Sequence, residues 1–225
     1  MQRFRWQIEV MGHDFDIDAL SAIDPALVTS KDDDRRYVSH PDWEQLNDAG
    51  AVRSAATTLT GRLSSTLALT RGNSPVEVGH LTREFGADGP RAVHHLDAVS
   101  ISSRSSVGTP SLGGGAPSVD SARPYEVRLD ELRHRSIKVN HIVELIVDSR
   151  WTELYKAYEA LRHELGGQNG IAANQIATVS EIKSFTRSAQ PHGHYEQHYP
   201  NPIPHDAAVS LLKRLLRALV DRKNP

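Results

Sequence analysis

A stretch rich in Ser, Gly and Pro interrupts the sequence near its middle and most constrains how the chain can fold. Residues 102–124 read SSRSSVGTPSLGGGAPSVDSARP and contain no aromatic side chain. Such a composition cannot bury a core and predicts a flexible linker, which we place at 103–124. The 225-residue chain is thereby divided into an N-terminal domain at 1–102 and a C-terminal domain at 125–225, each long enough to bury its own core.

The composition limits the class of protein. Hydrophobic residues make up 38% and charged residues 24% of the chain, a globular balance, and the net charge of −2 does not by itself demand a nucleic-acid or membrane partner. The absence of cysteine excludes disulfides and thiolate metal sites. The first residues lack the apolar region of a signal peptide, and no apolar run has the roughly 18 residues of a membrane span. We therefore expect a cytoplasmic protein.

Alternating hydrophobicity predicts strands in the N-terminal domain. The period of two over 4–10 is typical of a strand, and the face that carries Trp6 and Ile8 is expected to be buried. Alternation resumes at 15–17 after a Gly-His turn, which predicts a hairpin over 3–17. Residues 24–41 contain KDDDRR and two prolines and are predicted to form a loop.

The rest of this domain combines a long helix with a second hairpin. Apolar residues three or four apart predict one amphipathic helix over 43–67, ended by Gly72. Two extended runs, 76–85 and 91–102, flank a Gly- and Pro-containing turn and predict the hairpin. The expected N-terminal fold is therefore α+β, with two hairpins and one long helix packed in layers.

The C-terminal domain is predicted to be all-α. Helical periodicity extends over 127–147, 151–165, 178–189 and 206–223. A capping box at 178–181 opens the third helix, and Asp206 can cap the fourth. We expect a four-helix bundle with Leu215 and Leu216 at its core.

A polar, aromatic segment at 185–206, FTRSAQPHGHYEQHYPNPIPHD, joins the last two helices. A loop of this kind between helices is where a site is commonly built. Three interpretations stay open. The histidines can serve structural roles, or three of them can bind a metal, or they can carry out acid–base chemistry on RNA. The residues concerned are Arg187, His192, His194, Glu196, His198 and His205.

The spacing of Arg187 and the following histidines is similar to that of a known helical family. A helix that carries an arginine, a histidine after four to six intervening residues, and then the last helix of a bundle together resemble the HEPN four-helix fold. Over 125–223 this resemblance implies a metal-independent ribonuclease or RNA-binding module of the toxin or antiviral-defence type. Arg187 would then hold phosphate, and His192 or His194 would transfer the proton. Other arginines have a histidine at this spacing, in Arg35–His40, Arg128–His134 and Arg135–His141.

A second resemblance rests on motifs along the C-terminal half. WTELYKAYEALRHELGG, followed by FTRSA and a histidine-containing loop, is similar to a group of uncharacterised bacterial proteins. Those proteins read approximately LYKVYE, then GG, then Phe-Thr-His-Thr-Ala-Asn, then Ala-Arg-His. This sequence departs from the pattern at Arg187, Gln190 and Gln197. The residues along these motifs that would bind at the same site are Tyr155, Lys156, Glu159, Gln190 and His198.

Two functions of different classes follow from the sequence. One is an RNA-binding or RNA-cleaving defence protein with the site above, no cofactor and no metal. The other is a non-catalytic sensor or adaptor, in which the N-terminal domain binds a protein partner and the histidine loop is structural. Neither function involves a membrane, and both leave a homodimer open.

Overall fold

The computed structural model describes residues 4–86, 89–95, 123–189 and 202–223. The chain divides into two compact units, 1–102 and 103–225, which are described separately below. Most of the predicted linker lies outside the described residues, so its flexibility stays a prediction. The elements of the first unit are β1 (Trp6–Met11), α1 (Asp14–Ile23), β2 (Val28–Asp32), β3 (Arg35–Ser39), the 3₁₀ helix η1 (Pro41–Gln45), α2 (Ala49–Arg71), β4 (Glu77–Gly86) and β5 (Gly89–His95).

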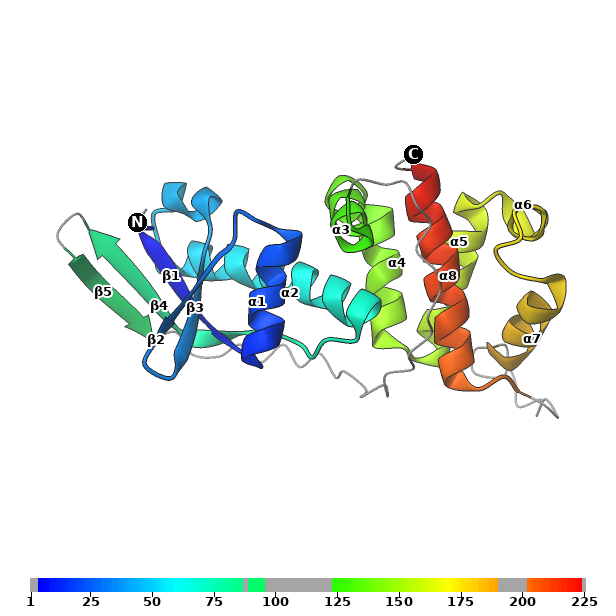
Figure 1. The fold of residues 1–225 in the computed structure, drawn as a ribbon, viewed down its shortest axis with the longest axis horizontal. Coiled ribbons are helices and arrows are strands. Elements are labelled where there is room, and N and C mark those ends of the chain that lie inside the picture. The colour runs from blue at the N-terminus through cyan, green and yellow to red at the C-terminus, as the bar shows by residue number, and fades with distance from the viewer. Residues whose placement is uncertain (1–3, 87–88, 96–122, 190–201, 224–225) are drawn as a thin grey trace. The chain divides into compact units, whose positions relative to one another are not determined.

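The first unit is an α+β fold built on one five-stranded antiparallel sheet with the strand order β2-β3-β1-β4-β5. β1 lies between β3 and β4 and is antiparallel to both. The units β1-α1-β2 and β3-α2-β4 therefore interlock, which is the split βαβ arrangement of ferredoxin-like topologies, here extended by β5. Figure 1 shows α1 and α2 against the sheet.

The face of the sheet beneath these helices forms the core, as the alternation in β1 predicted. Trp6, Ile8 and Val10 are buried there with apolar residues of α1 and α2. The indole N–H of Trp6 donates to the carbonyl of Leu46 at 3.1 Å, so the largest side chain of the strand keeps its one donor satisfied.

The predicted hairpin over 3–17 is wrong in its second half, because Asp14–Ile23 is the helix α1. Ile17, Leu20 and Ile23 recur every three residues and are buried, whereas Phe15 is 75% exposed. The apparent alternation of Phe15 and Ile17 with aspartates covered too few residues to distinguish a strand from the first turn of a helix.

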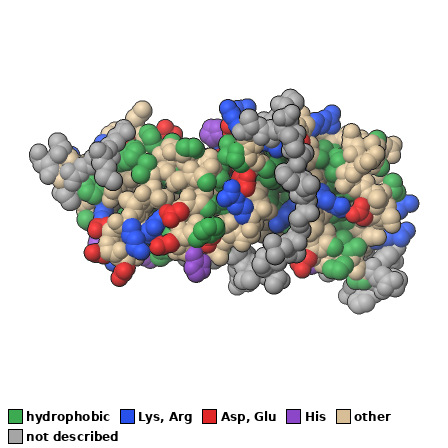
Figure 2. Space-filling model, in the orientation of Figure 1, with side chains coloured by type: hydrophobic (Ala, Val, Ile, Leu, Met, Phe, Trp, Pro, Cys, Tyr) green, Lys and Arg blue, Asp and Glu red, His purple; other side chains and the backbone are tan. Residues whose placement is uncertain are grey.

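The predicted loop at 24–41 is also wrong, because most of it forms the hairpin β2–β3. Two of its basic residues, one on each strand, pair with carboxylates of α1. Lys31 Nζ lies 3.3 Å from Asp14, and Arg36 forms an ion pair with Asp18. Figure 2 shows acidic and basic side chains interspersed at the strand-bearing end. A charged edge strand of five residues resembles a loop in composition, and this explains the error.

The long helix and the second hairpin are confirmed with adjusted bounds. α2 begins at Ala49 instead of 43, because residues 41–45 form η1 and the carboxylate of Asp48 accepts from the Ala51 N–H at 2.8 Å. The helix ends where predicted, since Gly72 adopts the left-handed conformation with φ 75°. β4 and β5 pair antiparallel through 86 and 89, while residues 96–102 of the predicted second strand lie outside the described residues.

An irregular bulge in β4 depends on Glu9 of β1. The register shifts between Ile8 and Val10, and one carboxylate oxygen of Glu9 accepts from the backbone N–H groups of His80 and Leu81 at 2.9 and 3.1 Å. Gly79 leaves room for this carboxylate, because a Cβ there would lie 2.6 Å from it. The bulge therefore requires glycine for space, and Glu9 replaces the missing ladder acceptors.

We expect Gly79→Ala to lower the free energy of unfolding by roughly 1–3 kcal/mol, because the new methyl group displaces Glu9 and leaves two N–H groups without their acceptor. Gly61→Ala is the matched control. A Cβ at Gly61 meets nothing within 4 Å in the middle of α2, so this change should raise stability by roughly 0.5–1 kcal/mol. Urea unfolding of the two variants measures both effects, and equal effects would contradict the account of the bulge.

The second unit is all-α, and its described part contains six helices instead of the predicted four. The expected helix over 127–147 is interrupted at Ser136, which is extended and caps the following helix by accepting from the Val139 N–H at 3.3 Å. A short helix also follows Gly166, where only a stop was predicted. The helices are α3 (Tyr125–Arg135), α4 (Ile137–Asp148), α5 (Trp151–Glu164), α6 (Gly167–Ala173), α7 (Val179–Ala189) and α8 (His205–Lys223).

α8 provides much of the core of this unit. It contacts α3, α4 and α5, and Leu215 and Leu216 are fully buried, as predicted. The helix begins at His205, so Asp206 lies in its first turn and is not the predicted cap. An aspartate there still stabilises the helix, because its negative charge lies near the positive end of the helix dipole.

Leu215→Ala should lower the free energy of unfolding by roughly 2–4 kcal/mol, since it removes a fully buried side chain and leaves a cavity. Ser210→Ala on an exposed position of α8 is the control and should change stability by less than about 0.5 kcal/mol. Chemical denaturation followed by circular dichroism measures the difference. A loss below about 1 kcal/mol at Leu215 would contradict its place in the core.

Candidate functional site

Arg187 lies in the last turn of α7, and its side chain is exposed. The predicted capping box opens this helix, with the Thr178 N–H donating to Glu181 at 2.8 Å and the Glu181 N–H donating to the Thr178 hydroxyl at 3.1 Å. The opposite side of α7 is buried through Ile182, Phe185, Ser188 and Ala189. Arg187 is therefore held on a well-defined helix without being part of the core.

A hydrogen bond just after Arg187 joins the end of α7 to the residues that precede α8. The hydroxyl of Ser188, which is buried, donates to the Ser184 carbonyl at 2.9 Å and accepts from the Ile203 N–H at 2.9 Å. The two residues that flank segment 190–201, Ser188 and Ile203, are thus held next to each other. His192, His194, His198 and Gln190 lie in this segment, outside the described residues, so their predicted roles stay predictions.

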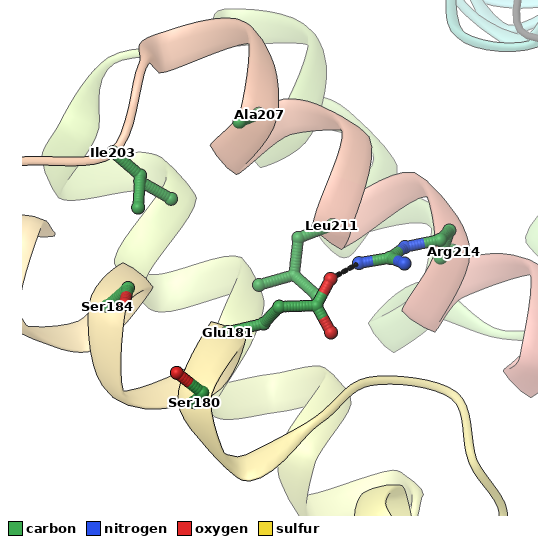
Figure 3. Close-up of a pocket in the computed structure, with 7 residues that line it drawn as sticks. All are labelled: Ser180, Glu181, Ser184, Ile203, Ala207, Leu211 and Arg214. Atoms are coloured by element: carbon green, nitrogen blue, oxygen red, sulfur yellow. Dashed lines mark hydrogen bonds and ion pairs between the residues drawn. The ribbon is translucent and has the colours of Figure 1, made fainter.

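A shallow groove lies between α7 and α8 beside this closure (Figure 3). Its volume is about 450 Å³, including space open to solvent. One end is formed by an ion pair in which Arg214 donates to Glu181 at 2.6 Å. The lining residues are Ser180, Glu181, Ser184, Ile203, Ala207, Leu211 and Arg214.

Two residue stripes build the groove. Ser180 and Ser184 of α7 are four residues apart, and Arg187 follows three residues later, so all three lie on one side of the helix. The same spacing relates Ala207, Leu211 and Arg214 of α8. Arg187 shares this side of α7 but is not among the residues that line the groove. The spacing is the signal by which the groove residues could have been found in the sequence.

The ion pair between α7 and α8 lowers the pKa of the groove carboxylate. The Arg214 guanidinium, with help from the Thr178 backbone, lowers the pKa of Glu181 to about 2. Both side chains are about half exposed, so the pair contributes little to stability. Burial lowers the pKa of Lys213, which directly precedes Arg214 on α8.

The motif residues of α5 mostly pack the core. Leu154 and Tyr158 are buried, and the Tyr158 ring lies 5.2 Å from that of Phe185 on α7. Tyr155 is half-buried and packs on Tyr158 at 6.4 Å between centroids. Packing thus accounts for most of the residues that carry the second resemblance.

The charged residues predicted beside Tyr155 pair within their own helix. Lys156 Nζ lies 3.0 Å from Glu153, and Arg162 lies 3.2 Å from Glu159. Lys156 and Glu159 do not pair with each other in the described contacts. Both remain accessible enough to exchange these surface partners for another ligand.

His205, one of the loop histidines, has a structural contact. Its Nε2 is 2.5 Å from the carbonyl oxygen of Ser149, and its ring lies edge-on to Trp151 at 5.6 Å. A carbonyl only accepts, so Nε2 carries a proton and donates it. The first turn of α8 is thereby attached to the α4–α5 junction, which is the structural role that the sequence left open for this residue.

The Arg35–His40 pair does not form a comparable site. His40 is buried, caps η1 through Nδ1 at 3.2 Å from the Asp42 N–H, and packs on Trp43, while Arg35 pairs with Glu9. Within residues 4–86, 89–95, 123–189 and 202–223, no three His, Asp or Glu side chains gather closely enough to hold a metal ion.

The two units differ in charge. Residues 1–102 contain 10 Lys and Arg against 15 Asp and Glu, whereas residues 103–225 contain 16 against 13. The helical unit is therefore the more suitable one for an anion.

Comparison with known proteins gives no assignment. No family model, no curated protein and no solved structure matches the chain. In the part of the chain that the structure describes, no helix has both the length and the apolar character needed to cross a membrane.

We expect Glu181→Gln to lower the free energy of unfolding near neutral pH by about 1 kcal/mol or less. Because the folded-state pKa is depressed, the contribution of Glu181 is present above its usual value of 4.5 and is lost as the pH falls towards about 2. The difference between wild type and variant should therefore shrink over that range in urea titrations. A pH-independent difference, or full additivity with Arg214→Gln, would contradict the pairing.

Proposed function

We propose that the helical unit binds RNA through a phosphate held by Arg187 and cleaves it with a histidine of the adjoining segment. The observation that carries the proposal is the Ser188–Ile203 hydrogen bond, which brings both ends of the histidine-bearing segment to the turn that presents Arg187. His192 follows Ala189 by three residues, so its Cα lies within roughly 11 Å of the described end of α7. An imidazole can therefore reach a phosphate held at Arg187.

The chemistry needs only these groups. A neutral imidazole accepts the proton of the 2′-hydroxyl, and the freed oxygen attacks the adjacent phosphorus. The 5′ oxygen leaves with a proton from an imidazolium, and the products are a 2′,3′-cyclic phosphate and a 5′-hydroxyl. Arg187 would stabilise the charge that develops on the phosphorane oxygens. This reaction class fits the resemblance to HEPN proteins and a defence or toxin role.

We expect Arg187→Ala to lower RNA affinity about tenfold or more and to abolish cleavage without loss of stability, because the side chain is exposed. Arg135→Ala is the matched control, since Arg135 is an exposed arginine of the same unit. Filter binding at several salt concentrations and mapping of product ends measure both effects. The salt slope should fall by about 1 for Arg187→Ala only.

Substitutions of His192 and His194 should have different effects in the same cleavage assay. Only one imidazole can lie within about 3 Å of the reacting proton, so His192→Ala and His194→Ala should differ in rate. Cleavage should persist in chelator; its loss would instead indicate His192, His194 and His198 as metal ligands. Unchanged RNA binding and cleavage in all three variants would reject the proposal.

The second candidate is a protein adaptor, favoured by apolar exposure on the N-terminal unit. Phe15 in the first turn of α1 is 75% exposed and Met11 at the end of β1 is 44% exposed. Large apolar side chains in such positions are typical of contact surfaces. Phe15→Ala should abolish capture of a protein partner from the native cell if this function holds, and should leave RNA binding unchanged.

A further inference from the structure

The groove between α7 and α8 presents hydrogen-bond donors that are open to a ligand. A guanidinium has five N–H donors, and among the described residues Arg214 uses only Nη2, which donates to Glu181 at 2.6 Å. The hydroxyls of Ser180 and Ser184 line the same groove, and neither has a hydrogen-bond partner within the described part of the chain. The groove therefore offers an arginine and two hydroxyls to its occupant.

Glu181 orients this arginine. Its Oε2 accepts from the backbone N–H and the hydroxyl of Thr178 at 2.8 and 2.9 Å, and its Oε1 accepts from Arg214. Both carboxylate oxygens are thus occupied, and the three donors partly compensate their charge. The Arg214 side chain is fixed at one nitrogen and is still 52% exposed. An arginine held in this way is suited to bind a phosphate with its other donors.

The form of the groove favours a strand over a small molecule. Its volume of about 450 Å³ includes space open to solvent, whereas sites for small ligands enclose most of the ligand surface. Leu211 is buried in the floor and Ile203 is half-buried, and no aromatic side chain is among the residues that line the groove. Base stacking therefore cannot be the main source of binding, and contacts to a strand backbone remain.

The groove follows the side of α7 that also carries Arg187. Ser184 and Arg187 are three residues apart on this side, although Arg187 does not line the groove itself. Glu181, which Arg214 contacts, precedes Arg187 by six residues, or roughly 9 Å along the helix axis. This distance spans about two to three nucleotides at the roughly 3.4 Å spacing of a stacked strand. Figure 3 shows Ser184 towards one end of the groove and the Glu181–Arg214 pair at the other.

We propose that the RNA strand held at Arg187 continues into the α7–α8 groove, where Arg214 binds a second phosphate. This inference rests on the proposed RNA function and adds the path of the strand and its minimum length. Ser184 lies between Arg187 and Glu181 on α7 and can donate to the intervening sugar or phosphate oxygens. Because these contacts are made to the backbone, little preference for base sequence is expected.

Strand length tests the path in cleavage assays, which report only RNA that is bound at Arg187. Arg214→Gln should lower kcat/KM roughly threefold to tenfold for a strand of about ten nucleotides, mainly through KM. The effect should disappear for a strand of about two nucleotides, because such a strand is too short to reach from Arg187 to Arg214. Arg187→Ala should abolish cleavage of both strands.

Binding can be measured without cleavage on 2′-O-methyl strands, because their attacking hydroxyl is blocked. Fluorescence anisotropy with a strand of about ten nucleotides should show a salt slope lower by about 1 for Arg214→Gln, and by about 2 when Arg187→Ala is combined with it. Two separate phosphate contacts predict this sum.

Charge variants separate phosphate binding from a purely structural role of the ion pair. Arg214→Gln and Glu181→Gln both break the pair, so a structural role predicts the same effect of each on RNA affinity. The proposal predicts opposite effects, because Glu181→Gln removes a negative charge beside the strand and should tighten binding about twofold. Arg162→Gln is the matched control, since Arg162 is 44% exposed on α5 and pairs with Glu159. It should leave RNA affinity unchanged, and circular dichroism verifies that each variant is folded.

Three results would overturn the proposal. These are wild-type affinity and salt slope in Arg214→Gln with the longer strand, equal weakening by Arg214→Gln and Glu181→Gln, and weakening by Arg162→Gln as strong as that by Arg214→Gln. If Arg187→Ala still weakens binding in these cases, only the path through the groove is wrong. If the wild type binds no RNA, or if Arg187→Ala has no effect, the RNA function fails as well.

Discussion

The packing of Phe185 against α5 is the interaction on which the helical unit most depends. The Phe185 ring is fully buried and lies 5.2 Å from Tyr158 and 6.5 Å from Trp151, measured between centroids. Trp151 in turn contacts His205 at the start of α8. These contacts join α5, α7 and α8, and through them the turn with Arg187 is held on a rigid support. A site on this turn would therefore be positioned by buried aromatic rings several residues away.

The fold could be predicted wherever one periodicity extended over enough residues. The alternation in β1 and the apolar stripe of α8 gave correct elements, and Trp6, Leu215 and Leu216 are buried as expected. The errors occurred in short elements. Phe15 in the first turn of α1 is exposed, and the two charges of β2 have partners on α1 and β4. Tertiary contacts therefore determined these two elements, against what the local composition predicted. The break at Ser136 depends on one capping hydroxyl within an otherwise continuous apolar pattern.

The candidate site was less accessible from sequence. The motif around Tyr155 and Phe185 was recognisable, but its residues act mostly in packing, which a motif alone cannot distinguish from binding. The groove residues Ser184 and Arg214 come from helices that run past one another. Both line the groove between α7 and α8, which the Glu181–Arg214 ion pair spans, and the sequence of either helix alone does not predict this arrangement. His205 shows the opposite case, in which a histidine suited to chemistry is used to attach a helix end.

The Ser188–Ile203 bond has a consequence for how this protein can change over evolutionary time. Because the Ser188 hydroxyl joins the residues on either side of segment 190–201, the stability of the helices depends only weakly on the length of that segment. Lengthening a loop whose ends are already joined costs only about 0.6 kcal/mol for each doubling. Insertions and substitutions in the segment can therefore accumulate while the bundle stays intact, so this part of the chain is free to acquire a new specificity at little risk to folding.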